Sequence, residues 1–188
     1  MEPQNLTMDL AGRELRISVS PISTYANGSA VVSLGDTFVM ANATMSEKGK
    51  DGADFFPMTV DYEENFYAAG KIKGSRFIKR EGRPSENAIL TSRLIDRPIR
   101  PLFPKGTINE VQLICSVLSA DQEVDPGVTA MNAASIALLL SGAPFAGPIG
   151  SVRMGYLNEK LIVNPTYKEC EEGKMSLIVA GTLDAITM

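Results

Sequence analysis

The sequence predicts an α+β fold, in which mixed or antiparallel sheets pack against helices. Three observations lead to this prediction. Apolar and polar residues alternate along the first third of the chain, two helix-like segments occupy the middle, and short strand-like runs return toward the C-terminus. Alternation at period two is the pattern of a half-buried strand, whereas a long apolar run rich in alanine and leucine is typical of a buried helix.

The first strands are predicted from this alternation. Residues 13–19 (RELRISV) alternate at period two, and two further runs are joined by Gly35-Asp36. That dipeptide favours a tight hairpin turn because glycine adopts positive φ without strain. We therefore expect the fold to begin with antiparallel strands. The strands predicted here are 13–19, 29–34, 37–45 and 57–61, with a polar loop at 46–54.

A first helix is predicted after a long glycine-containing loop at 64–84. Ser85 is suited to cap a helix N-terminus, and Glu86 is suited to the first turn. The helix should span 85–97, because Pro98 disfavours the α conformation of the residue that precedes it.

A second helix, 127–141, is apolar on nearly all faces, which predicts a buried element closely packed through its small residues. Gly142 is a natural stop. Apolar runs predict further strands at 111–119, 149–156, 160–164 and 176–182. The last strand runs almost into the C-terminus. Because proteins rarely leave an apolar edge exposed there, we expect the chain to be cut from a longer protein or trimmed to its ordered part.

Positive charge is concentrated in residues 71–105. This segment holds ten of the eighteen basic residues and only three acids, a formal charge of +7, whereas the whole chain carries −4. An acidic protein that gathers its positive charge in one stretch is suited to a polyanion. Local handling of phosphate groups fits this pattern better than nonspecific coating of nucleic acid.

The composition excludes several classes of protein. The sequence has no histidine, which removes histidine-based triads and histidine metal sites. Its apolar runs are too short for a membrane span, and its N-terminus lacks the regions of a signal peptide. Cys115 and Cys170 are expected to be reduced thiols of a cytoplasmic protein. The acids of 121–125 and 169–172 are predicted to lie in solvated loops, without a metal-ligand pattern.

The basic loop contains candidate RNA-binding residues. Phe77 could stack under a base while Lys79, Arg80 and Arg83 contact backbone phosphates. The alternative is that Phe77 and the adjacent Ile78 anchor the loop to the core, and spacing alone does not decide between the two interpretations. The loop glycines are not followed by Gly-Lys-Ser/Thr, which argues against a nucleotide-binding P-loop.

A candidate phosphate-binding group follows this loop. Arg93 and Arg97 are four residues apart and share a face of the predicted helix, and Arg100 lies just beyond it. The planar guanidinium group of arginine can donate two parallel hydrogen bonds to the oxygens of one phosphate. The alternative is that these arginines form structural ion pairs with Asp96 or with acids elsewhere.

Three runs of sequence identify a family resemblance. They are FFPMTVDYEENFYAAGKIKGSRFIKREGRPSENAILTSRLIDRPIRPLFPKG (55–106), GPIGSVRMGY (147–156) and SLIVAGT (176–182). Together they resemble the bacterial polynucleotide phosphorylases, in the first of their two RNase PH-like repeats. The resemblance covers nearly the whole chain, and the REGRPS and LIDRPIRPLFP motifs are highly specific.

That resemblance implies an RNase PH-like α+β fold, incomplete at the C-terminus. Residues 1–145 would form the first RNase PH-like core, and 146–188 would begin the second half of the same repeat. The whole enzyme would degrade RNA from its 3′ end with inorganic phosphate, release nucleoside diphosphates, and run in reverse as a polymerase. It would use Mg²⁺, form a ring-shaped homotrimer around single-stranded RNA, act in mRNA degradation in the cytoplasm, and reach RNA-degradation partners through regions missing here.

The resemblance also implies that this repeat is not catalytic. In the active repeat, an Asp-x-Asp pair that holds magnesium precedes the V-A-G strand, whereas Lys174 and Ser176 occupy the matching positions here. No catalytic or metal-binding residue is therefore expected in this chain. In relatives the loop matching 76–83 lines the RNA channel, although Ile78 and Lys79 stand where an aromatic residue and an arginine are common. A purely RNA-binding or assembly module remains the alternative.

Overall fold

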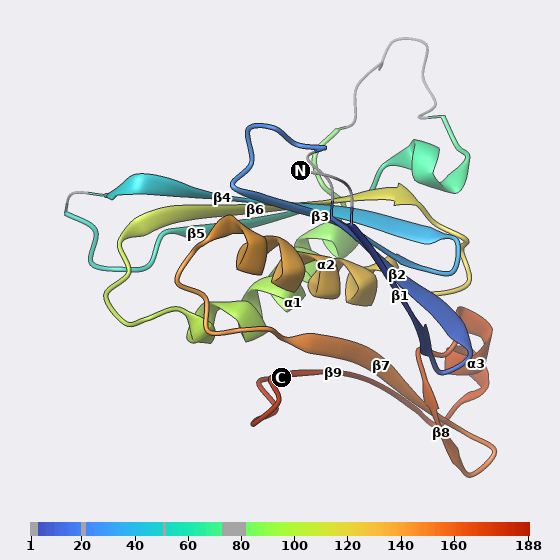
Figure 1. The fold of residues 1–188 in the computed structure, drawn as a ribbon. Helices are drawn as coiled ribbons and strands as arrows, with labels where there is room; N and C mark the ends of the chain where they lie inside the picture. The colour runs from blue at the N-terminus through green and yellow to red at the C-terminus, as the bar shows by residue number, and fades with distance from the viewer. Residues whose placement is uncertain (1–3, 20–21, 51, 73–81) are drawn as a thin grey trace.

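The computed structural model describes residues 4–19, 22–50, 52–72 and 82–188 (Figure 1). A six-stranded sheet forms one layer, helices cover one of its faces, and a three-stranded sheet lies beyond the helices. This arrangement confirms the predicted α+β class. None of the described helices is long and apolar enough to cross a membrane.

The large sheet is mixed. Its strands follow in the order β1-β2-β3-β4-β6-β5, and only the edge pair β5 and β6 is parallel. The strands are β1 (Gln4–Leu10), β2 (Arg13–Val19), β3 (Gly28–Leu34), β4 (Thr37–Gly49), β5 (Met58–Glu63) and β6 (Asn109–Ser119). The predicted hairpin is confirmed, since Leu34 pairs with Thr37 around Gly35, whose φ is 58°.

Two parts of this sheet differ from the prediction. β4 continues to Gly49, so the prediction that a polar loop starts at residue 46 is wrong. The extension pairs with β6 beyond a bulge, and Ser46 holds it by accepting a hydrogen bond from the Glu110 backbone N–H at 2.9 Å. β1 was not predicted. Its apolar residues Leu6, Met8 and Leu10 alternate with polar residues, so a period-two signal was present in the sequence and was missed.

The first helix, α1 (Glu86–Ile99), begins as predicted. Ser85 caps it by accepting a hydrogen bond from the Ala88 backbone N–H at 2.9 Å. The predicted end before Pro98 is wrong, because the helix continues through that residue and passes into a short 3₁₀ turn, η2 (Arg100–Leu102). Burial of Ile95, Pro98 and Ile99 in the core offsets the local preference against a helix before proline.

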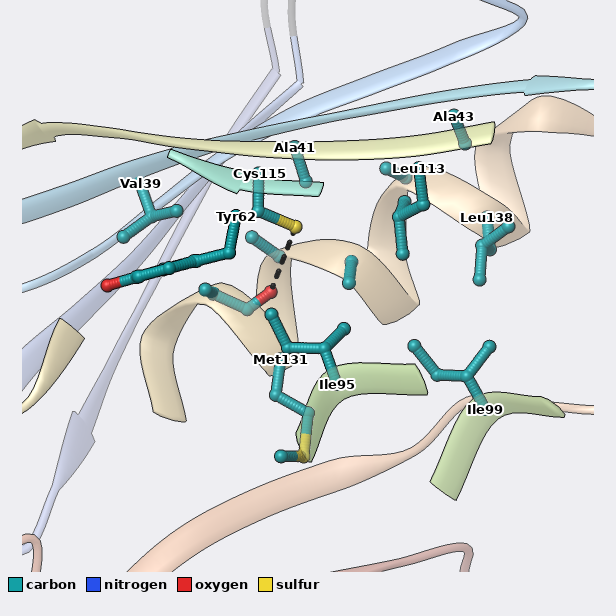
Figure 2. Close-up of a cluster of buried hydrophobic side chains, with 14 of the residues drawn as sticks. Val39, Ala41, Ala43, Tyr62, Ile95, Ile99, Leu113, Cys115, Met131 and Leu138 are labelled. Carbon is teal, nitrogen blue, oxygen red and sulfur yellow. Dashed lines mark hydrogen bonds between the residues drawn. The ribbon is translucent and has the colours of Figure 1, made fainter. Parts of the chain in front are cut away.

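The second helix, α2 (Pro126–Ser141), lies at the centre of the molecule. It ends at Gly142 in the left-handed conformation, as predicted. β3 crosses it so closely that a Cβ on Gly28 would lie 2.1 Å from the Ala137 carbonyl oxygen. Figure 2 shows Met131 and Leu138 of this helix packed in a cluster with side chains of the sheet and of α1. Small residues therefore allow the helix and sheet to approach closely, as expected.

The small sheet has the order β8-β7-β9, and its neighbouring strands are antiparallel. Its strands, β7 (Gly150–Leu157), β8 (Lys160–Val163) and β9 (Met175–Gly181), match the predicted ranges within one residue. A short helix, α3 (Tyr167–Glu172), separates β8 from β9. The acids at 169–172 therefore lie on a helix and not in the predicted loop, because Thr166 and Glu169 form a reciprocal capping box that starts it.

Candidate functional site

The predicted RNA-binding loop is described only at its borders. Phe77, Lys79 and Arg80 lie outside the described residues, as does Ile78 with its alternative anchoring role. Arg83 is described and exposed, and it lines a cavity of about 550 Å³. The structure therefore describes one of the four residues that were predicted to contact RNA.

This cavity lies between the end of β5, the 3₁₀ turn η1 (Phe66–Ala69) and the start of α1. Its wall is held by hydrogen bonds from consecutive residues that follow β5. Glu64 accepts hydrogen bonds from the Ser85 hydroxyl and the Asn87 side-chain amide, both at 2.7 Å. Asn65 donates to the Val117 carbonyl at 3.2 Å. These bonds join η1 to both α1 and β6, so the cavity has a fixed frame.

Of the three predicted phosphate-binding arginines, Arg100 makes contacts that stabilise the fold. Its Nε and Nη2 donate to the two carboxylate oxygens of Asp96 at 2.9 and 2.7 Å. Its Nη1 and Nη2 also donate to the carbonyls of Phe56 and Met58 at 3.1 and 3.0 Å. The guanidinium lies 5.6 Å from the centre of the Phe56 ring. Its donors are thus engaged in joining α1 to the segment that leads into β5.

Arg93 and Arg97 are exposed on α1, and both line a second cavity of about 560 Å³ together with Arg100. Within the described ranges, their guanidinium groups have no hydrogen-bond or ion-pair partner. The structural ion pair with Asp96, proposed as the alternative for the whole group, is therefore formed by Arg100, while Arg93 and Arg97 point to solvent-accessible space.

Lys174 and Ser176, which the family resemblance predicts to stand in place of catalytic carboxylates, lie just before β9 and near its start. The Ser176 hydroxyl lies 3.4 Å from Nη1 of Arg153 on β7. Arg153 in turn forms an ion pair with Asp125, which caps α2 by accepting a hydrogen bond from Gly127 at 2.8 Å. The ammonium of Lys174 and the guanidinium of Arg153 cannot ligate Mg²⁺, which takes oxygen ligands, and the neutral hydroxyl of Ser176 supplies no carboxylate charge.

Two phenols and a thiol elsewhere in the described structure are kept protonated by their surroundings. Burial is the main cause that raises the pKa of Tyr62 well above its usual range, with a further contribution from the Asp125 carboxylate. Burial also raises the pKa of Tyr167, and Asp125 again contributes. Burial raises the pKa of Cys115 to about 12. None of these groups is suited to act as a base near neutral pH.

The structure assigns roles to residues that sequence reasoning missed. Asp125 was grouped with solvated acids, yet it caps α2 and is paired with Arg153. The Asp125-Pro126 dipeptide, a common helix start, was a signal that could have revealed this cap. The roles of Arg153 and Glu64 depend on contacts distant in sequence, and no local pattern announces them. No group of three or more potential metal ligands is found within the described ranges.

Comparison with known proteins decides the family. Residues 11–144 match the 3′ exoribonuclease family, domain 1, and residues 147–188 match domain 2 of that family. The chain belongs to the 3′ exoribonuclease family. It is 55% identical over 97% of its length to a polyribonucleotide nucleotidyltransferase of Caulobacter sp. (strain K31), and 54% identical over 96% to that of Clostridioides difficile (strain 630). These relatives confirm the resemblance seen in the motifs, and the chain spans only 25% and 26% of their lengths.

Solved structures of this 3′ exoribonuclease fold agree with the assignment. A chain from an Archaeoglobus fulgidus exosome with RNA bound to the active site matches all of this chain and 75% of its own, with a TM-score of 0.65 and 21% identity. An archaeal exosome core gives a TM-score of 0.60, also at 21% identity. At this level of identity the likeness concerns the fold, and it confirms the RNase PH-like α+β prediction.

Proposed function

We propose that this chain is the N-terminal part of a phosphorolytic 3′-to-5′ exoribonuclease, which also polymerises RNA in the reverse direction. Membership of the 3′ exoribonuclease family and high identity to polyribonucleotide nucleotidyltransferases support this proposal. The reaction would exchange RNA and inorganic phosphate for nucleoside diphosphates, in the service of mRNA degradation in the cytoplasm. Partners in RNA degradation would be recruited by regions outside this chain.

Within that enzyme, this repeat guides RNA and does not perform the chemistry. The observation that carries this conclusion is the replacement of the carboxylate pair by Lys174 and Ser176, with Arg153 beside Ser176. A positively charged environment disfavours the cation that would polarise phosphate. Mg²⁺ and the reacting phosphate therefore belong to the second repeat of the whole protein, which lies outside this sequence.

The +7 segment supports the guiding role. Its loop contributes Phe77, Lys79, Arg80 and Arg83 to single-stranded RNA, and a ring-shaped homotrimer would place three such loops around one channel. The division of the chain near residue 145 separates the core that carries this loop from the small sheet. A module that only binds RNA and supports assembly, without any enzyme attached, is the second candidate, favoured by the same missing carboxylates.

The salt dependence of RNA binding tests the guiding role. Each phosphate neutralised by a basic side chain adds roughly 0.7 to the slope of log affinity against log salt for a single strand. Replacing Lys79, Arg80 and Arg83 together with alanine should lower both the affinity and this slope, by roughly 2 if all three contact phosphates. A matched variant is the replacement of Lys48, Lys50 and Lys160, which should leave the slope nearly unchanged. Equal affinity of the loop variant and the wild type at low salt would contradict the guiding role.

A further inference from the structure

The cavity beside η1 has the features of a ligand site. Its volume of about 550 Å³ lies within the range of pockets that bind small molecules, which is roughly 300–1,000 Å³. Its frame is fixed by a hydrogen bond that Glu64 accepts from Ser85 and one that Asn65 donates to the Val117 carbonyl. It also combines aromatic, acidic and basic side chains from segments distant in sequence, a mixture that a cavity formed only by loose packing would not require.

The charges in this cavity are balanced. Glu63 and Glu64, at and just beyond the end of β5, supply two carboxylates, while Lys71 and Arg83 supply two cations. A purely acidic ligand would meet the carboxylates, and a purely basic ligand would meet the cations. The cavity therefore favours a ligand that carries both hydrogen-bond donors and negative charge.

The aromatic wall narrows the choice further. Phe66 lines the cavity with 42% of its surface exposed, and it lies between the acidic and basic groups in sequence. A flat ring packed against such a side chain is stabilised by stacking. Glu63 already accepts one hydrogen bond from Ser116 through Oε2 at 2.7 Å, and its second oxygen can accept one from a ligand N–H.

We propose that this cavity is a nucleotide subsite, in which a base with an exocyclic amino group packs against Phe66 and donates to Glu63, while Lys71 and Arg83 bind its phosphate. The subsite deepens the proposed RNA-guiding function, on which it rests, because Arg83 belongs to both. One nucleotide of a single strand that passes the basic loop would occupy it. The site selects for the amino-bearing base and the attached phosphate together, and not for phosphate alone.

The test uses the 188-residue chain with isotope-labelled alanine methyl groups, followed by NMR during titration. Ala69 and Ala88 line the cavity, whereas Ala180 is buried elsewhere and serves as an internal reference. Adenosine monophosphate should shift the Ala69 and Ala88 methyl signals in a saturable way and leave Ala180 unchanged. Inorganic phosphate should not reproduce these shifts. Absence of shifts at millimolar adenosine monophosphate, or identical shifts with phosphate alone, would overturn the subsite.

Two pairs of variants sharpen the test. Phe66→Leu removes the ring but keeps an apolar side chain, and it should weaken adenosine monophosphate binding at least about fivefold. Its control is Tyr25→Leu, which changes a 99% exposed aromatic residue outside the cavity. Lys71→Ala should also weaken binding, whereas Lys105→Ala, another exposed lysine of the basic segment, should not. Unchanged affinity in both Phe66→Leu and Lys71→Ala would refute the assignment.

A parallel titration with a labelled oligoadenylate separates this subsite from the wider function. If the oligonucleotide binds with strong salt dependence while the monophosphate leaves the cavity signals unmoved, the subsite is wrong and the RNA-guiding function stands. If the monophosphate binds in the cavity while the oligonucleotide fails to bind, the subsite stands and the guiding function is wrong.

Discussion

Arg100→Ala should destabilise the protein strongly, because this side chain joins α1 to the start of β5. The change removes a bidentate pair with Asp96 and hydrogen bonds to the carbonyls of Phe56 and Met58. Hydrogen bonds to charged groups contribute roughly 1.5–3 kcal/mol each, and they are not additive within one side chain. The side chains of Arg100 and Asp96 are 39% and 27% exposed, so solvent screens part of the charge interaction.

These terms give an expected loss of about 3 kcal/mol in the free energy of unfolding. For a chain of this size, the melting temperature should fall by roughly 6–12 °C, measured by calorimetry or circular dichroism. Arg100→Lys should recover only part of the loss, because an ammonium cannot make the same planar set of bonds.

Arg97→Ala is the matched control on the same helix. Its side chain is exposed, so the expected cost is below about 1 kcal/mol. If Arg97 and Arg93 bind an anion, phosphate should raise the melting temperature of the wild type more than that of Arg97→Ala. A melt of Arg100→Ala indistinguishable from wild type, or an equal loss in Arg97→Ala, would refute the structural role given to Arg100.

Three further changes test other parts of the structure. Gly28→Ala should lower the free energy of unfolding, measured in urea, by at least about 2 kcal/mol, because the new Cβ would lie 2.1 Å from the Ala137 carbonyl oxygen. Gly150→Ala is the control: its Cβ would meet open space, so the free energy of unfolding should fall by less than about 1 kcal/mol. A thiol reagent should modify the half-buried Cys170 of the native protein and spare the buried Cys115, whose pKa of about 12 keeps it protonated. Equal modification rates of the two thiols, measured by mass spectrometry, would contradict the core described here. Lys174→Asp combined with Ser176→Asp should not create phosphorolytic activity, because Arg153 remains paired with Asp125 and no aligned phosphate-binding group is restored. Release of nucleoside diphosphate by this double variant would show that the carboxylates alone were lacking.

Local patterns predicted most of the fold because most elements carry their own signals. The β3–β4 hairpin follows from Gly35 between two alternating runs, and α2 follows from its uniform apolar composition. The predicted end of α1 was wrong for a physical reason. Pro98 opposes the helix locally, but the burial of its neighbours in the core outweighs that preference.

The site was predicted less completely than the fold. Charge spacing identified Arg83 and the exposed pair on α1, since basic residues clustered in sequence also remain close on one helix or loop. It could not distinguish Arg100, whose partners include carbonyls more than forty residues away at Phe56 and Met58. Asp125 and Arg153 are likewise brought together only by the packing of α2 against β7. Ion pairs between distant segments depend on the tertiary fold, so they cannot be predicted from the spacing of residues in the sequence.

A phosphorolysis assay on this chain beside a full-length relative tests most directly whether this repeat lacks chemistry. Both would be incubated with single-stranded RNA, inorganic phosphate and Mg²⁺, and nucleoside diphosphates would be quantified by chromatography. We expect the full-length protein to release nucleoside diphosphates, whereas the 188-residue chain should bind the RNA and release none. Robust release of nucleoside diphosphates by the purified chain would contradict the claim that Lys174 and Ser176 mark a repeat without chemistry.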